Sequence, residues 1–178
     1  SDLSDLVVIL KNTSRLQHLN LTRNGISDAS DLKELKQLSY VLLGRNKISD
    51  VSPLGELKLL RVLHLWENDI SDVSALGGLT RLIELKLGGN KIIDVSSMRD
   101  LRQLKTLDLH INQISDVSAF KELKHLEILR LNNNKITDVS PLKGLTQLKK
   151  LWIDGNPLSE AQINDLQRAL PDCEFRHD

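Results

Sequence analysis

Two columns of polar residues recur along the sequence at fixed spacing and have side chains that can do chemistry. An asparagine returns every 22 residues, at Asn24, Asn46, Asn68, Asn90, Asn112, Asn134 and Asn156. An amide carries both hydrogen-bond donors and acceptors, so each asparagine can satisfy backbone groups of its own turn and of the next one. No neighbouring residue would make these amides nucleophilic or acidic. We therefore interpret the asparagine column as structural.

An aspartate column runs beside it, at Asp28, Asp50, Asp72, Asp94, Asp116 and Asp138, with Glu160 in the same slot. Each carboxylate can accept hydrogen bonds from the N–H groups that open the following turn, with Ser52, Ser74, Ser118 and Ser140 adding further caps. The alternative is a calcium ladder. Calcium requires about six to eight oxygen ligands, and calcium-binding solenoids supply them from Gly-rich turns that this sequence lacks. The capping interpretation is therefore favoured.

The histidines and glycines complete no catalytic or metal-binding motif. His18, His64 and His110 fall on alternate expected strands, about 10 Å apart, which is too far for a shared metal ion. His125 and His177 are isolated. Neither Gly77-Gly78 nor Gly88-Gly89 is followed by the Lys and Ser or Thr of a phosphate-binding loop. We expect no enzymatic activity, no cofactor and no bound metal.

The elements that position these columns are seven copies of one unit. A leucine opens each copy, at Leu16, Leu38, Leu60, Leu82, Leu104, Leu126 and Leu148. The unit reads L-x-x-L-x-L-x-x-N-x-I-x-D-V, where the alternating x-L-x-L-x segment predicts a strand with inward leucines. The second half predicts a short 3₁₀ or irregular turn on the opposite side. Such units stack into a solenoid of the leucine-rich repeat class, because one unit cannot bury its own leucines.

The predicted fold is an α/β leucine-rich repeat solenoid. It is a right-handed curved superhelix with a concave parallel β-sheet, convex 3₁₀ or irregular turns and a C-terminal helical cap. Residues 1–15 are expected to be a partial repeat or a truncated N-terminal cap, and residues 16–158 hold the seven repeats. Residues 159–178 are expected to form a capping helix and strand, where Ser159 and Gln162 make a capping box.

Composition limits the class of partner. Lys plus Arg and Asp plus Glu number 24 each, so no global field favours a nucleic acid, and no apolar run is long enough for membrane insertion. The single cysteine, Cys173, leaves the redox compartment open. We expect a monomer that binds a protein ligand.

The outward residues of the expected strands mark where such a ligand would bind. Tyr40, Leu42, Val62 and Trp66 cluster on two adjacent strands, and Gly44 and Gly88 on either side of Trp66 are expected to leave space above its indole. Exposed apolar and aromatic residues gathered in a concavity indicate a contact surface, although they are also compatible with scattered surface residues or with cover from the N-terminal portion. The predicted partner-binding residues are Tyr40, Leu42, Val62, His64, Trp66, Lys86, Asp108, His110, Arg130 and Trp152, with Trp152 alone at the far end.

The units ISDVSPLGELKLL, ISDVSALGGLTRL and ITDVSPLKGLTQL closely resemble the repeats of bacterial internalin-type leucine-rich repeat proteins. The resemblance covers about Leu10 to Leu158 and implies a concave sheet presented to a protein ligand, at the cell surface or secreted rather than in the cytoplasm. The chain lacks the recognisable helical N-terminal cap and the immunoglobulin-like region of internalins, so the resemblance does not imply an invasion role. One alternative is an intracellular adaptor, similar to phosphatase regulatory subunits. Another is an engineered scaffold, against which the irregular outward residues Trp66, Ile111 and Trp152 argue.

Overall fold

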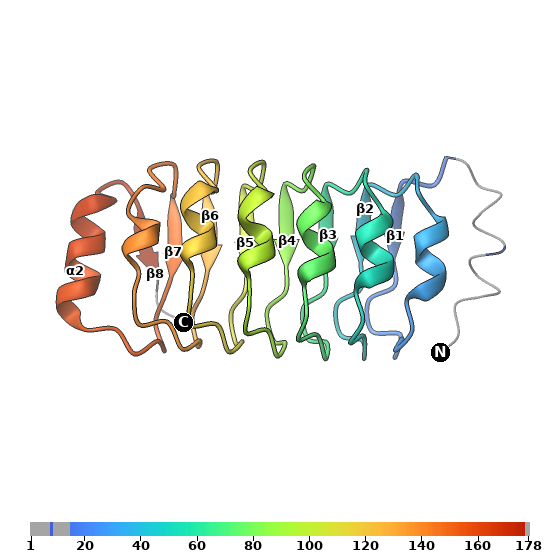
Figure 1. Cartoon of the computed structure of the whole chain (residues 1–178), viewed down its shortest axis with the longest axis horizontal. Coiled ribbons are helices and arrows are strands. Elements are labelled where there is room, and N and C mark those ends of the chain that lie inside the picture. The colour runs from blue at the N-terminus through green and yellow to red at the C-terminus, as the bar shows by residue number, and fades with distance from the viewer. Residues whose placement is uncertain (1–7, 9–14, 177–178) are drawn as a thin grey trace.

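Eight short parallel strands form one open sheet in chain order (Figure 1). The computed structural model describes Val8 and residues 15–176. The strands are β1 (His18–Asn20), β2 (Tyr40–Leu42), β3 (Val62–His64), β4 (Glu84–Lys86), β5 (Thr106–Asp108), β6 (Ile128–Arg130), β7 (Lys150–Trp152) and β8 (Glu174–Arg176). Seven strands come from the repeats, and β8 extends the sheet at the C-terminal end.

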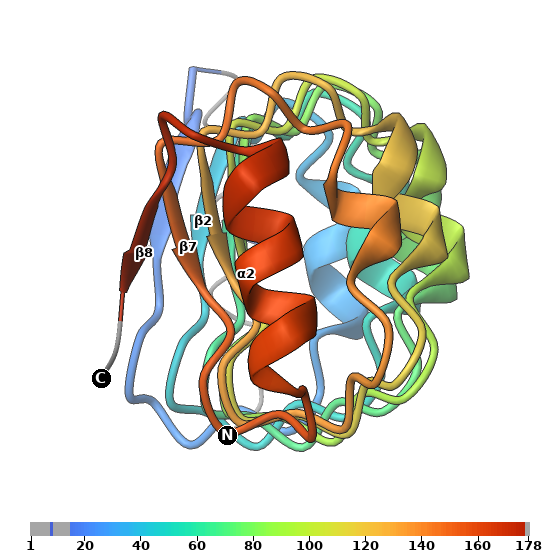
Figure 2. The ribbon, with the colours of Figure 1, turned by 90° about the vertical axis from the view of Figure 1, so that its left-hand side faces the viewer.

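Six 3₁₀ turns line the side of the coil opposite the sheet (Figure 2). They span Ser30–Glu34, Ser52–Glu56, Ser74–Gly78, Ser96–Asp100, Ser118–Glu122 and Ser140–Leu142. The fold class predicted from the sequence is confirmed, since strands on one side and 3₁₀ turns on the other alternate along a single solenoid. The partial repeat or cap expected at 1–15 lies outside the described residues, of which only Val8 and Arg15 fall in this range. His177 also lies outside them.

The core is a stack of aliphatic layers between sheet and turns. The central residue of each strand faces inward, and in register Leu63 of β3 stands beside Leu85 of β4 and Leu107 of β5. All three side chains are fully buried. Period-2 alternation places every central leucine on this face, which leaves the flanking residues of each strand on the other face.

The asparagine column ties each turn to its neighbours, as predicted. Asn68 Nδ2 donates to the carbonyls of Leu43 and Leu65 at 3.0 Å each, and its Oδ1 accepts from the backbone N–H of Ile48 at 2.9 Å. The same three contacts recur from Asn46 to Asn156. Each amide therefore satisfies backbone groups that would otherwise be buried without partners.

The aspartate column caps the turns. Asp72 Oδ1 accepts from the backbone N–H of Ser74 at 2.8 Å, and the contact recurs in the other repeats. These hydrogen bonds stabilise the charged form and lower the pKa of Asp72, Asp94 and Asp138. The serines differ from expectation, because none of their side chains caps a turn; the hydroxyls of Ser52 and Ser140 instead donate to Asp50 and Asp138.

Helix α2 (Glu160–Ala169) covers the C-terminal end of the core (Figures 1 and 2). The predicted capping box between Ser159 and Gln162 is present, and Leu166 is fully buried. The chain then returns through Cys173 to β8. Burial raises the pKa of the Cys173 thiol to about 11, so it is protonated at neutral pH.

Candidate functional site

The sheet face that points away from the core carries columns of side chains in register. One column runs Tyr40, Val62, Glu84, Thr106, Ile128 and Lys150, and the next runs Leu42, His64, Lys86, Asp108, Arg130 and Trp152. These residues are half-buried, except for Asp108, which is buried. The face is therefore closely packed, and several of the predicted partner-binding residues contact one another.

The N-terminal part of this face is an aromatic and ionic cluster. Tyr40 lies edge-on to His18, with ring centroids 5.3 Å apart, and 6.3 Å from the ring of His64. His64 Nε2 lies 2.7 Å from Glu84 Oε1, which also accepts from Lys86 Nζ at 2.8 Å. In the register of β2 and β3, Val62 lies beside Tyr40 and Leu42 lies beside His64.

The charges of this cluster are settled by burial and pairing. Burial lowers the pKa of His64, and Lys86 lowers it further against the opposing effect of Glu84, so the imidazole is neutral at pH 7. Burial raises the pKa of Glu84, but the hydrogen bonds from Lys86 and His64 outweigh it and lower the pKa overall. The charge of Lys86 is thus already balanced by Glu84.

Trp66 packs against the strand before its own. A Cβ atom at Gly44 would lie 2.4 Å from Trp66 Cε2, so the indole occupies the space that a side chain there would need. Arg45 lies over the same ring at 5.2 Å from the centroid and pairs with Glu67 at 2.7 Å. The open space expected above the indole is therefore absent on the Gly44 side, which corrects that prediction.

His110 repeats this arrangement two strands later. A Cβ atom at Gly88 would lie 2.1 Å from the imidazole, so Gly88 makes room for His110. His110 Nδ1 lies 2.6 Å from Asp108 Oδ1. Because an ionised carboxylate can only accept, Nδ1 carries the proton in this contact. Asp108 is buried and orients His110. Its carboxylate is therefore not freely available to a ligand.

Trp152 is not alone at the far end, contrary to expectation. The guanidinium of Arg130 lies over its ring at 4.3 Å from the centroid. Cation–π stacking of this kind fixes a side chain that would otherwise be mobile.

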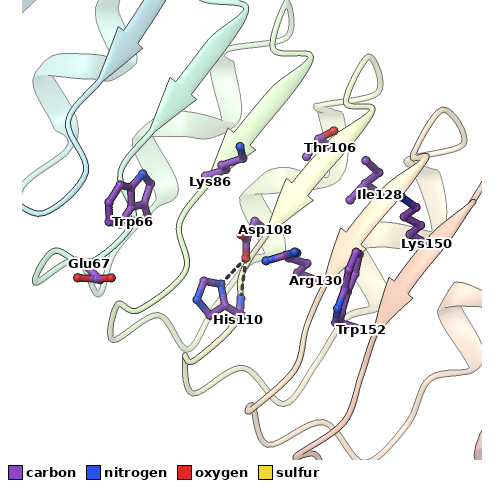
Figure 3. A pocket seen from close by; sticks show the side chains of 10 residues that line it. All are labelled: Trp66, Glu67, Lys86, Thr106, Asp108, His110, Ile128, Arg130, Lys150 and Trp152. Carbon is purple, nitrogen blue, oxygen red and sulfur yellow. Dashed lines mark hydrogen bonds and ion pairs between the residues drawn. The ribbon is translucent and has the colours of Figure 1, made fainter. Parts of the chain in front are cut away.

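A hollow of about 470 Å³ on the sheet face is lined by both tryptophans, which lie at its two ends (Figure 3). Six of the predicted partner-binding residues line it, namely Trp66, Lys86, Asp108, His110, Arg130 and Trp152. Tyr40, Leu42, Val62 and His64 lie outside the lining, on β2 and β3. The lining also contains Glu67, Thr106, Ile128 and Lys150, which the sequence analysis did not select. Thr106, Ile128 and Lys150 could have been selected because they lie in one outward column of the sheet. Glu67 lies in the turn after β3, outside the columns.

Comparison with known proteins identifies the repeats. Models described as leucine-rich repeat match residues 14–30 and 58–114, and one described as leucine-rich repeats in two copies matches residues 124–168. An internalin, InlF, from Listeria monocytogenes superposes on 98% of the chain with a TM-score of 0.77 and 31% identity. The chain is an internalin-type leucine-rich repeat protein. Leucine-rich repeat folds serve as protein-interaction modules and are generally without enzymatic activity.

Other solved structures agree with this assignment to the internalin type. Internalin C2 from Listeria monocytogenes matches 94% of the chain with a TM-score of 0.88 and 29% identity. A leucine-rich repeat protein from Leptospira interrogans matches 94% with a TM-score of 0.87 and 31% identity. The internalin-type chain spans 57%, 73% and 44% of the lengths of InlF, internalin C2 and the Leptospira protein. No curated protein matches its sequence.

The part of this leucine-rich repeat protein that the structure describes contains neither a metal-binding cluster nor a membrane-spanning helix. No group of three His, Cys, Asp or Glu side chains there could hold a metal ion. No helix among the same residues is long and apolar enough to cross a bilayer.

One turn of the internalin-type array holds an unusual residue beside the hollow. The residue after the sheet face has a positive φ in every repeat, at Arg23, Arg45, Glu67, Gly89, Ile111, Asn133 and Gly155. At Ile111 φ is 49°, and a β-branched residue is strained in this left-handed conformation. The Ile111 side chain is 54% exposed, so burial does not compensate fully for the strain.

We expect Ile111→Asn to stabilise this leucine-rich repeat protein by about 1 kcal/mol, because asparagine tolerates the left-handed conformation that Asn133 adopts in the next repeat. Thermal melting followed by circular dichroism should show a midpoint about 2 to 4 °C higher. Ile93→Asn is the matched control, since Ile93 is 60% exposed without a positive φ. Equal shifts in the two variants would contradict the strain.

Proposed function

We propose that the chain binds a protein ligand in the hollow on its sheet face and catalyses no reaction. The observation that carries this proposal is the presence of both tryptophans of the chain in one hollow, on the face that the core does not use. Trp, Tyr and Arg are the residue types most enriched at binding hot spots.

The lining is held in place before any ligand arrives. Gly44 accommodates Trp66, Asp108 orients His110, and Arg130 stacks on Trp152. Side chains that are already ordered lose less conformational entropy on binding, which increases affinity. This arrangement supports a role in recognition.

An exposed apolar residue supports the same site. Ile111 is 54% exposed and directly follows His110 of the hollow. We propose that Ile111 extends the apolar contact at the rim.

The proposed setting is the cell surface or the extracellular space, on the similarity to internalins, and the proposed state is a monomer. Support for a monomer comes from the edge strand β8, where Arg176 and Glu174 form an ion pair at 2.8 Å. Charged side chains on an edge strand disfavour pairing with a second sheet.

Site-specific photo-crosslinking tests the proposal. Benzoylphenylalanine is placed at position 106, in the hollow, or at position 93, outside it, and each protein is incubated with cell-surface and cytosolic fractions. We expect one protein, from the surface fraction, to crosslink from position 106 and not from position 93. Affinity for that protein should fall at least about tenfold in Trp66→Ala with Trp152→Ala.

Circular dichroism of the double variant controls for folding. Equal crosslinking from both positions, or binding that does not change in a folded double variant, would exclude the hollow as the binding site. Crosslinking of a cytosolic protein alone would favour the intracellular adaptor.

A further inference from the structure

The positively charged side chains that line the hollow differ in whether they form an ion pair with a carboxylate. Lys86 is paired with Glu84 at 2.8 Å. Within the described part of the chain, neither the guanidinium of Arg130 nor Nζ of Lys150 has an aspartate or glutamate at ion-pair distance, and both side chains line the hollow.

The carboxylates of the lining are engaged elsewhere. Glu67 is paired with Arg45 at 2.7 Å, and Asp108 Oδ1 lies 2.6 Å from His110 Nδ1. Asp108 stands beside Arg130 in the strand register, but it is only 7% exposed and already in contact with His110. The hollow therefore presents a local positive charge at its C-terminal half, although the chain as a whole has a net charge of zero.

The stacking of Arg130 leaves its donors in a useful orientation. The guanidinium carbon lies 4.3 Å from the centroid of the Trp152 ring, and the N–H groups of a guanidinium lie in its plane, at its edge. A planar guanidinium held in this way matches a carboxylate through two parallel hydrogen bonds. Lys150 lies two residues before Trp152 on β7 and can add a second charge.

From these observations we infer that the hollow recognises an acidic segment of its protein partner, whose carboxylate side chain pairs with Arg130 and Lys150 while an apolar residue about four positions away packs on Trp66, three strands from Arg130. The inference rests on the proposed function and specifies its ligand. A continuous polyanion fits less well, because Glu84 and Glu67 on the same side of the chain would repel it.

The test uses a displayed library of random 12-residue peptides as the probe, selected on the folded chain. The two tryptophans report binding directly through their fluorescence, since the chain contains no others. We expect the selected peptides to share an Asp or Glu with an apolar residue about four positions away. Replacing that acid by its amide, or making Arg130→Gln, should raise the Kd at least about tenfold.

A double-mutant cycle identifies the pair. In the Arg130→Gln background, the acid-to-amide change in the peptide should have little further effect. Arg99→Gln, which removes an exposed arginine on the 3₁₀ side, is the matched control and should leave the Kd unchanged. Lys150→Gln should weaken binding in the same direction, and added salt should weaken wild-type binding more than that of Arg130→Gln.

The outcomes separate the inference from the proposed function. Peptides that bind through Trp66 and Trp152 but carry no acid, or that bind Arg130→Gln equally well, would overturn the inference alone. If heparin binds as tightly as the peptides, the ligand is a polyanion and not an acidic protein segment, which would also overturn the inference. Failure to select any peptide sensitive to Trp66→Ala and Trp152→Ala would count against the hollow as a binding site.

Discussion

Asn90→Ala is expected to lower the free energy of unfolding by about 2 to 4 kcal/mol, because it leaves the buried N–H of Ile70 without this acceptor and removes one of the two amide hydrogen bonds to the carbonyls of Leu65 and Leu87. Asn90 Nδ2 donates to the carbonyls of Leu65 at 3.0 Å and Leu87 at 2.9 Å, and Oδ1 accepts from the N–H of Ile70 at 3.0 Å. Leu65 and Ile70 belong to one repeat and Leu87 to the next, so the loss affects contacts within and between repeats. Urea unfolding followed by circular dichroism measures the change.

Asn24→Ala is the control for this experiment. Asn24 has the same place in its repeat, but it is exposed and donates to the carbonyl of Thr22. Water can replace a hydrogen bond at an exposed site, so we expect a loss of about 1 kcal/mol or less. Similar losses in the two variants would show that the amides are not needed to satisfy the buried turns.

The backbone plan could be predicted from the sequence because a fixed repeat constrains it at every level. Alternation in x-L-x-L-x places the leucines inside, and the constant spacing aligns equivalent residues on neighbouring strands. Leu63, Leu85 and Leu107 stand in register as a consequence. The columns of the sheet face follow from the same rule, so six residues of the hollow could be selected before the structure.

The packing of the hollow could not be predicted in the same way. Glycine at positions 44 and 88 indicated space, but the rings that fill it, Trp66 and His110, reach it through side-chain rotations that the repeat does not fix. The stacking of Arg130 on Trp152 likewise depends on rotamers of adjacent strands. Sequence spacing determines which residues share a face, whereas local competition for space determines their contacts.

The left-handed turn was also hidden from the sequence. Its position holds Arg45, Glu67, Gly89, Ile111 and Asn133, which have no common chemical property. Gly89, Asn133 and Gly155 at this position are types that favour a positive φ, whereas the arginines, Glu67 and Ile111 are not. The hydrogen-bonded coil therefore imposes this conformation on unfavourable residues, and the strain at Ile111 is a consequence of the array.

Leu85→Ala is expected to destabilise the chain by about 2 to 5 kcal/mol, since truncation removes buried apolar area and leaves a cavity. Leu85 lies on the central strand β4 and is fully buried, between Leu63 and Leu107 on the neighbouring strands. In a solenoid each repeat is stabilised by its neighbours, so a cavity in β4 weakens the interfaces on both sides. Leu59→Ala, at a leucine that is 42% exposed, should cost about 1 kcal/mol or less. An unchanged melting temperature in Leu85→Ala, or an equal loss in both variants, would contradict the assignment of the core.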